Sequence, residues 1–225
     1  MGSDNLHHKR KAKRDKDVGR KKASRAPYEK VLIVCEGGKT EPLYFNEIRD
    51  FYEINTANIR ITGECGSDPV SVVNHAFALY DAEKDKADPF DRVYCVFDQD
   101  SYHLPPNQYQ QALDKIAQQH PKNTFFAITS VPCFEYWLLL HFVYTTAPFS
   151  AVGGVSVGAA VLNQLKTHWE EYDKGAKGTF LALKDKLDFA ITNAIRSLNA
   201  AAQNQTDNPT THIHELVSYL QHIKA

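Results

Sequence analysis

Short runs of consecutive apolar residues recur along the chain, and each is bounded by polar or turn-forming residues. Such runs, rich in β-branched side chains, are typical of strands that are buried on both faces of a parallel sheet. The expected strands lie at residues 31–35, 58–64, 93–97 and 125–129.

Between these runs the apolar residues recur every three or four positions, which is the spacing of an amphipathic helix. One such helix is expected from Thr40, as its N-cap, to Phe51, with Pro42 in its first turn. Others are expected at residues 70–86 and 106–119, and a very apolar one at 134–144 after Pro132. Four alternations of strand and helix predict an α/β fold, with a parallel sheet of about four strands flanked by helices.

The pattern changes after residue 150. Gly153 and Gly154 indicate a loop, and the remaining residues have helical spacing at 158–172, 178–203 and 210–223. We therefore expect three parts: a tail at 1–28 with almost no apolar content and no stable fold of its own, an α/β domain at 29–150, and a helical extension at 151–225 packed on the core.

Composition supports one sizeable core. The chain has 225 residues, of which 43% are hydrophobic, enough for a single domain with an appendage. We see no apolar stretch of roughly 18 residues and no apolar segment of a secretory signal near the start, so we expect a cytoplasmic protein without a membrane partner. The four cysteines are far apart, which argues against a structural zinc site.

The net charge of −1 conceals a strong asymmetry. Residues 1–26 carry ten Lys or Arg against three Asp, a balance of +7, so the rest of the chain carries −8. A basic arm on an acidic body is common among nucleic-acid-binding proteins; the alternative is a solubilising tail with no specific partner. The expected nucleic-acid-binding residues are Lys9, Arg10, Lys11, Lys13, Arg14, Arg20, Lys21 and Lys22.

Acidic residues follow two of the expected strands directly. Glu36 ends the first, and Asp98 ends the third with Asp100 two positions later. The carboxyl ends of parallel strands meet at one edge of a sheet, where ligands bind. Unpaired buried carboxylates are costly, and a divalent cation such as Mg²⁺, which prefers oxygen ligands, relieves their repulsion. If the first and third strands are neighbours, Glu36 meets the Asp pair.

These motifs resemble a known family. The strand 31–35 followed by Glu36-Gly37, and the strand 93–97 followed by Asp98-Gln99-Asp100, are similar to the Toprim pattern. Three longer segments resemble the RloB-like family, which accompanies restriction and abortive-infection systems. They are residues 36–45 (EGGKTEPLYF), residues 132–142 (PCFEYWLLLHF), and Asn208-Pro209-Thr210 followed by residues 214–217 (HELV).

The resemblance implies a Toprim-like fold, a role in antiviral defence, and a partner ATPase of the AAA or ABC type. It also implies that Glu36, Asp98 and Asp100 bind Mg²⁺ or Mn²⁺, with Glu36 also a candidate general base or acid. Lys39 is a candidate phosphate ligand and Glu41 a candidate additional carboxylate.

Several candidates have simpler interpretations. Asp98 and Asp100 can be solvated acids that cap a helix. Glu41 can complement a helix dipole, and Lys39 can be an ordinary surface lysine. Glu135 either completes the acidic cluster or is a buried structural acid paired with a basic side chain.

Two other phosphate-site motifs fit poorly. Gly38-Lys39-Thr40 lacks the first glycine of a Walker A loop, and phosphatases of the haloacid dehalogenase type place their Asp-x-Asp on the first strand. The leading hypothesis is thus an Mg²⁺-dependent nuclease that cleaves DNA or transfer RNA in a defence system. The alternative is a non-catalytic adaptor that binds nucleic acid or docks the ATPase.

Overall fold

A computed structural model describes residues 26–66, 68–99 and 107–225. Its centre is a sheet in the order β2-β1-β3-β4-β5. The strands β1 (Val31–Cys35), β2 (Ile59–Thr62), β3 (Arg92–Asp98) and β4 (Phe125–Val131) are parallel. The two-residue strand β5 (Thr210–Thr211) pairs antiparallel with β4. The mixed α/β class and the mainly parallel sheet confirm the prediction; β5 was not predicted.

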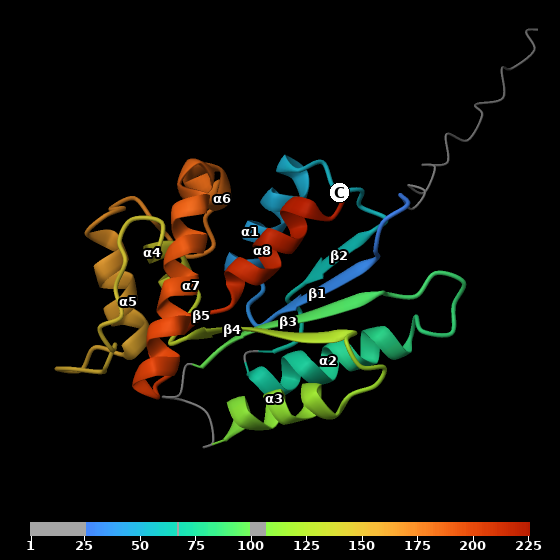
Figure 1. The fold of residues 1–225 in the computed structure, drawn as a ribbon, viewed down its shortest axis with the longest axis horizontal. Coiled ribbons are helices and arrows are strands. Elements are labelled where there is room, and N and C mark those ends of the chain that lie inside the picture. The colour runs from blue at the N-terminus through green and yellow to red at the C-terminus, as the bar shows by residue number, and fades with distance from the viewer. Residues whose placement is uncertain (1–25, 67, 100–106) are drawn as a thin grey trace, which may run out of the picture.

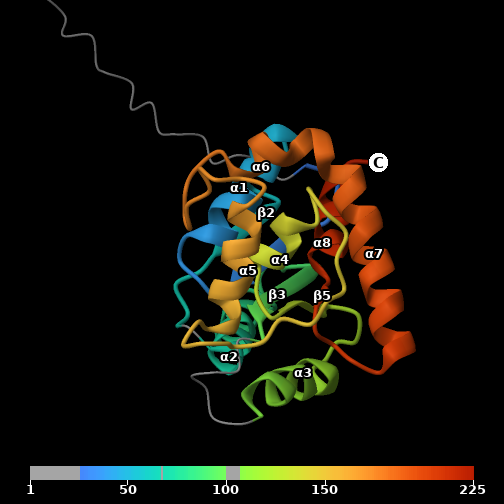
Figure 2. The same cartoon turned by 90° about the vertical axis from the view of Figure 1, so that its left-hand side faces the viewer.

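Helices cover both faces of the sheet (Figures 1 and 2). On one face lie α2 (Pro69–Asp81) and α3 (Gln108–Gln118). On the other lie α1 (Thr40–Phe51) and α8 (Ile213–His222), next to a group of helices formed by α4 (Glu135–Leu139), α5 (Val157–Lys166), α6 (Thr179–Leu183) and α7 (Leu187–Asn204). A short 3₁₀ helix, η1 (Lys184–Lys186), joins α6 to α7.

Alternating side chains of the strands pack into two separate hydrophobic cores, one on each face of the sheet. Leu32 and Val34 of β1 pack with α2 and α3, whereas Ile33 and Cys35 point to the opposite face, toward α1, α4 and α8. Because side chains alternate along a strand, β3 divides in the same way, and Val96 lies on the α1 face. The side chain of Asp98, two residues after Val96, therefore lies on the face of the sheet that is covered by α1 and α4.

Two helices begin differently from each other. Asp68 caps α2, accepting a hydrogen bond from the Ser71 amide at 2.9 Å. The predicted Thr40 N-cap of α1 is wrong by one position, since Lys39 occupies the N-cap and makes no side-chain cap bond. Thr40 is instead the first residue of the helix.

The very apolar helix is much shorter than predicted, ending at Leu139 instead of residue 144. Side chains satisfy the carbonyls at its end: Asn193 Nδ2 donates to the Leu140 carbonyl at 2.9 Å, and His141 Nδ1 lies 3.0 Å from the Trp137 carbonyl. Helix ends need such partners, and these allow the chain to leave the helix while still buried.

The last segments also differ from their predicted bounds. The helix expected at 158–172 ends at Lys166, and the one expected at 178–203 is divided into α6, η1 and α7. The helix expected from residue 210 begins only at Ile213, after β5. Isoleucine and leucine side chains of α8, with those of α5 to α7, belong to the same core as β1 and α1.

Candidate acidic site at the carboxyl ends of β1 and β3

The strand order reverses between β1 and β3. From β1 the chain crosses through α1 to β2 on one side, and it then returns through α2, on the opposite face, to β3 on the other side of β1. In open α/β sheets such a reversal leaves a crevice at the carboxyl ends of the two strands, where ligands bind. The sequence places Glu36 and Asp98 at these two strand ends.

Glu36 and Asp98 are in direct contact through the backbone. The Asp98 amide donates a hydrogen bond to Glu36 Oε2 at 2.9 Å, and Asp98 Oδ2 accepts one from the Phe134 amide at 3.0 Å. These bonds connect the ends of β1, β3 and the segment before α4. The adjacency on which the sequence hypothesis depended is therefore present.

Two further carboxylates come from the helices on this face. Glu41 is in the first turn of α1, and its side chain turns back toward the preceding loop, because a Cβ placed on Gly37 would lie 3.0 Å from Glu41 Oε2. Glu135 is the first residue of α4, and its side chain is only 3% exposed. The Lys174 ammonium lies 2.9 Å from Glu135 Oε1, and the Tyr172 hydroxyl donates to the same oxygen at 3.4 Å.

The carboxylates affect one another's ionisation. Burial, together with the charges of Glu41, Glu135 and Glu36, raises the pKa of Asp98 well above its ordinary value, against the opposing effect of the Phe134 amide. Burial and the charges of Glu135 and Glu36 raise the pKa of Glu41 to about 7, although the charge of Lys174 acts in the other direction. Desolvation and like charge both penalise the ionised form, so this cluster favours any cation that enters it.

Lys39 lies at the rim of the cluster, not within it. It is exposed at the start of α1, and its side chain runs beside the loop after α5: a Cβ placed on Gly175 would lie 3.1 Å from Lys39 Cβ. Gly175 has φ +73°, a backbone conformation that suits glycine. The loop that carries Lys174 thus passes close to Lys39.

A cysteine is close to the acids but is not activated. Burial and the charges of Glu135 and Asp98 raise the pKa of the Cys133 thiol well above its ordinary value. A thiol is nucleophilic only as the thiolate, so Cys133 is a poor nucleophile here.

The donor atoms suit a hard divalent cation, since they are carboxylate oxygens. Among the described residues, no three His, Cys, Asp or Glu side chains are already grouped as a metal site. Mg²⁺ is often held by one or two carboxylates, with water and substrate oxygens completing its shell. Glu36 and Asp98 meet this smaller requirement, with Glu41 beside them.

The predicted residues are thus placed unequally. Glu36, Glu41, Asp98 and Glu135 lie together, with Lys39 at the edge. Asp100 and the eight basic residues predicted to bind nucleic acid lie outside the described residues. Sequence reasoning missed Tyr172, at the end of an expected helix, and Lys174, in the short stretch between two expected helices. The only signal for them was the alternative interpretation of Glu135 as an acid with a basic partner.

Comparison with known proteins identifies the family of the chain. The family model described as RloB-like protein matches residues 31–220, which include all four carboxylates. The chain belongs to the RloB-like protein family. No curated protein and no solved structure matches it. Within the described residues, no helix has both the length and the apolar character needed to cross a membrane.

Proposed function

We propose that this RloB-like protein is a metal-dependent nuclease that cleaves phosphodiester bonds with Mg²⁺ or Mn²⁺. The supporting observation is the meeting of Glu36 and Asp98 at the strand-order reversal, where burial and the neighbouring carboxylates raise the pKa of Asp98. Such repulsion has no structural benefit, and a divalent cation relieves it.

In this proposal Glu36 and Asp98 hold the cation, joined by Asp100. When bound, such an ion polarises a phosphoryl oxygen and stabilises the charge that develops on it. Glu41 is then the best-suited general acid or base, because its pKa of about 7 lies near neutral pH. Lys39, beside the N-terminus of α1, is suited to contact a phosphate oxygen.

The wider biological role rests on the family resemblance and on charge. We infer that the substrate is DNA or transfer RNA, that the basic residues between Lys9 and Lys22 increase its affinity through phosphate contacts, and that the protein acts in antiviral defence with a partner ATPase. A fold alone does not fix a substrate, so these points require direct tests.

One observation favours a second function. Because the described part of the chain has no ready-made group of three metal-binding side chains, a non-catalytic adaptor that binds nucleic acid or docks the ATPase is the alternative. The two functions differ in their need for a metal. Calorimetric titration with Mn²⁺ should show binding to the wild type and weaker binding to Asp98→Asn; no heat from the wild type would favour the adaptor.

The nuclease is tested with purified protein against transfer RNA, plasmid and single-stranded DNA, with Mg²⁺, Mn²⁺ or EDTA, and with the partner ATPase present and absent. Asp98→Asn and Glu36→Gln should each lower the cleavage rate on the order of a hundredfold or more, since even residues behind metal ligands contribute 10- to 100-fold. Asp114→Asn is the matched control, because it removes an exposed carboxylate on α3. Full cleavage by the Glu36→Gln/Asp98→Asn double variant would refute the proposal.

A further inference from the structure

The loop between α5 and α6 brings a positive charge to the acidic site. Lys174 in this loop lies 2.9 Å from the carboxylate of Glu135. The acid is almost completely buried at 3% exposure, whereas the lysine side chain is 52% exposed. The Lys174 ammonium therefore contacts a buried acid while its side chain remains accessible to solvent.

Contacts on both sides hold this loop in place. After Lys174, the amides of Gly178 and Phe180 both donate to the Glu47 carboxylate on α1, the second at 2.9 Å. Before it, Tyr172 is buried and its hydroxyl donates to Glu135. Next to it, Gly175 lies close to Lys39. The position of the ammonium is thus fixed by α1 and α4, which also carry Glu41 and Glu135.

The charge of Lys174 is coupled to neighbouring acids of the cluster. Burial lowers the pKa of Lys174, but the charge of Glu135 and its hydrogen bond with the ammonium, together with smaller effects of Cys133 and Asp98, outweigh burial and raise it. In return the lysine lowers the pKa of Glu41. An ammonium has three donors, and the bond to Glu135 uses one, so the geometry allows a second partner on the exposed side.

A phosphodiester approaching several carboxylates is repelled unless a cation also faces it. We propose that Lys174 binds a phosphate oxygen of the nucleic acid strand at the acidic site, and that Glu135 is the positioning residue that holds its ammonium. This inference rests on the proposed function. It places the phosphate backbone of the nucleic acid on the side of the acidic cluster that is formed by the α5–α6 loop. A purely structural ion pair would not involve the strand.

Lysine acetylation footprinting of the full chain tests the contact without requiring cleavage. The protein is labelled alone and with a single-stranded DNA or RNA oligonucleotide, in Ca²⁺ buffer, and each lysine is quantified by mass spectrometry. Nucleic acid should protect Lys174 several-fold and leave Lys177 unchanged, because Lys177 is exposed in the same loop. Equal labelling of Lys174 with and without nucleic acid would overturn the inference, whether or not the protein cleaves.

Kinetics then separates phosphate binding from charge neutralisation. Lys174→Met should lower kcat/KM on the order of a hundredfold, Lys174→Arg should restore most of it, and Lys177→Met should have no effect. In the Glu135→Gln/Lys174→Met double variant the buried charge is gone, so recovered activity would show that Lys174 only neutralises Glu135. Protection of Lys174 with no cleavage by the wild type would support this inference and refute the nuclease.

Discussion

At the scale of single residues, the acidic site shows how local environment sets chemistry. Glu36, Glu41, Asp98 and Glu135 are carboxylates, yet their partners differ: backbone amides bond to Glu36 and Asp98, and a lysine and a tyrosine to Glu135. Glu41 has a hydrogen bond to its own backbone amide, but it also faces the charges of Glu135 and Glu36. Ionisation of Glu41 in this environment therefore costs the fold free energy.

This cost makes stability depend on pH. The pKa of Glu41 is about 7 in the fold against an ordinary 4.5, so between these pH values the native state binds more protons than the unfolded state. Stability must therefore fall as pH rises through this window, with no further loss from Glu41 above about pH 7. Asp98, whose pKa is also raised, acts in the same direction.

We expect Glu41→Gln to reduce this fall, so that the variant has a higher Tm than the wild type at pH 8 and nearly the same Tm at pH 4. Thermal unfolding followed by circular dichroism across this range measures the effect. Glu171→Gln, at an exposed residue of the loop after α5, should retain the wild-type profile. Parallel profiles for wild type and Glu41→Gln would contradict the assignment.

At the scale of elements, the site depends on how closely the β1–α1 turn approaches the end of β2. A Cβ placed on Gly63 would lie 1.9 Å from the Gly37 carbonyl oxygen and 2.9 Å from Pro42 Cγ. No side chain fits there unless the turn that follows Glu36 moves. Gly63 thus sets the position of the turn between Glu36 and Glu41.

Gly63→Ala should therefore destabilise the fold by about 1–3 kcal/mol, as overpacking does, and should also lower Mn²⁺ affinity by displacing the turn. Denaturant unfolding and calorimetry measure the two effects. Gly38→Ala is the control, since its Cβ would meet only the Gly63 carbonyl oxygen at 3.8 Å, an ordinary contact. A Gly63→Ala protein with wild-type stability would show that the turn adapts freely.

Sequence patterns predicted the elements that have a regular period. The strands β1, β3 and β4 are continuous apolar runs, and Glu36 and Asp98 mark their ends, so the strands and the meeting of these acids followed from position alone, given that β1 and β3 are neighbours. The end of α4 could not be predicted in this way, because it depends on a hydrogen bond to the Leu140 carbonyl from Asn193, which is distant in the chain. Lys174 likewise lies in a loop whose path is set by Glu47 and Glu135, and periodicity carries no information on such contacts.

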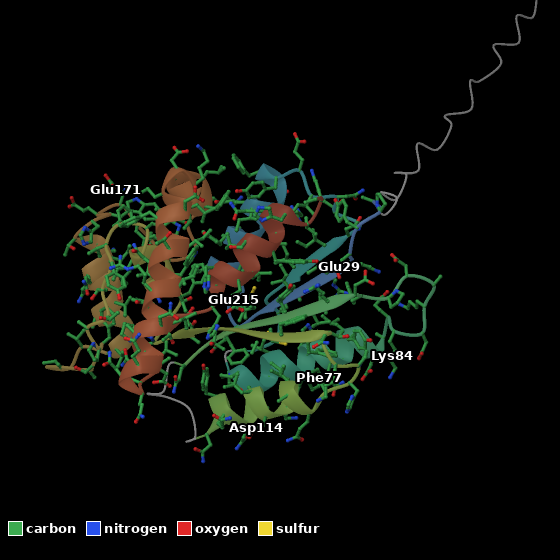
Figure 3. All side chains as sticks on the ribbon, viewed as in Figure 1. Glu29, Phe77, Lys84, Asp114, Glu171 and Glu215 are labelled. Atoms are coloured by element: carbon green, nitrogen blue, oxygen red, sulfur yellow. The ribbon has the colours of Figure 1, made fainter. Side chains whose placement is uncertain are left out.

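At the scale of the whole molecule, the two ends of the sheet have different characters. At the amino ends of the strands, Glu29 accepts hydrogen bonds from Arg92 Nε at 2.8 Å and the Tyr219 hydroxyl at 2.6 Å, and the Arg92 guanidinium lies over the Tyr219 ring. Figure 3 places Glu29 at this end and Glu171, which is in the same loop as Lys174, at the far side of the molecule. At the amino end Glu29 is paired with Arg92 and tied to α8, whereas at the carboxyl end the acids Glu36, Glu41, Asp98 and Glu135 lie together.

The helices after residue 150 share their core with the sheet, so the described chain should unfold as one unit. Leu216 of α8 is fully buried in this shared core. Leu216→Ala should cost about 2–5 kcal/mol and lower the Tm of a single transition, with equal calorimetric and van't Hoff enthalpies. Differential scanning calorimetry measures this. A second transition that keeps the wild-type Tm would show that residues 29–150 form an independent domain.

The path of the chain also has a consequence for its synthesis. A ribosome releases the acids at the ends of β1 and β3 and those of α1 and α4 before it releases Lys174. Proteins begin to fold from the N-terminus as they are made, but here Glu135 cannot pair with Lys174 until translation has passed residue 174. A nascent chain that stops short of Lys174 therefore carries these acids without this counter-charge.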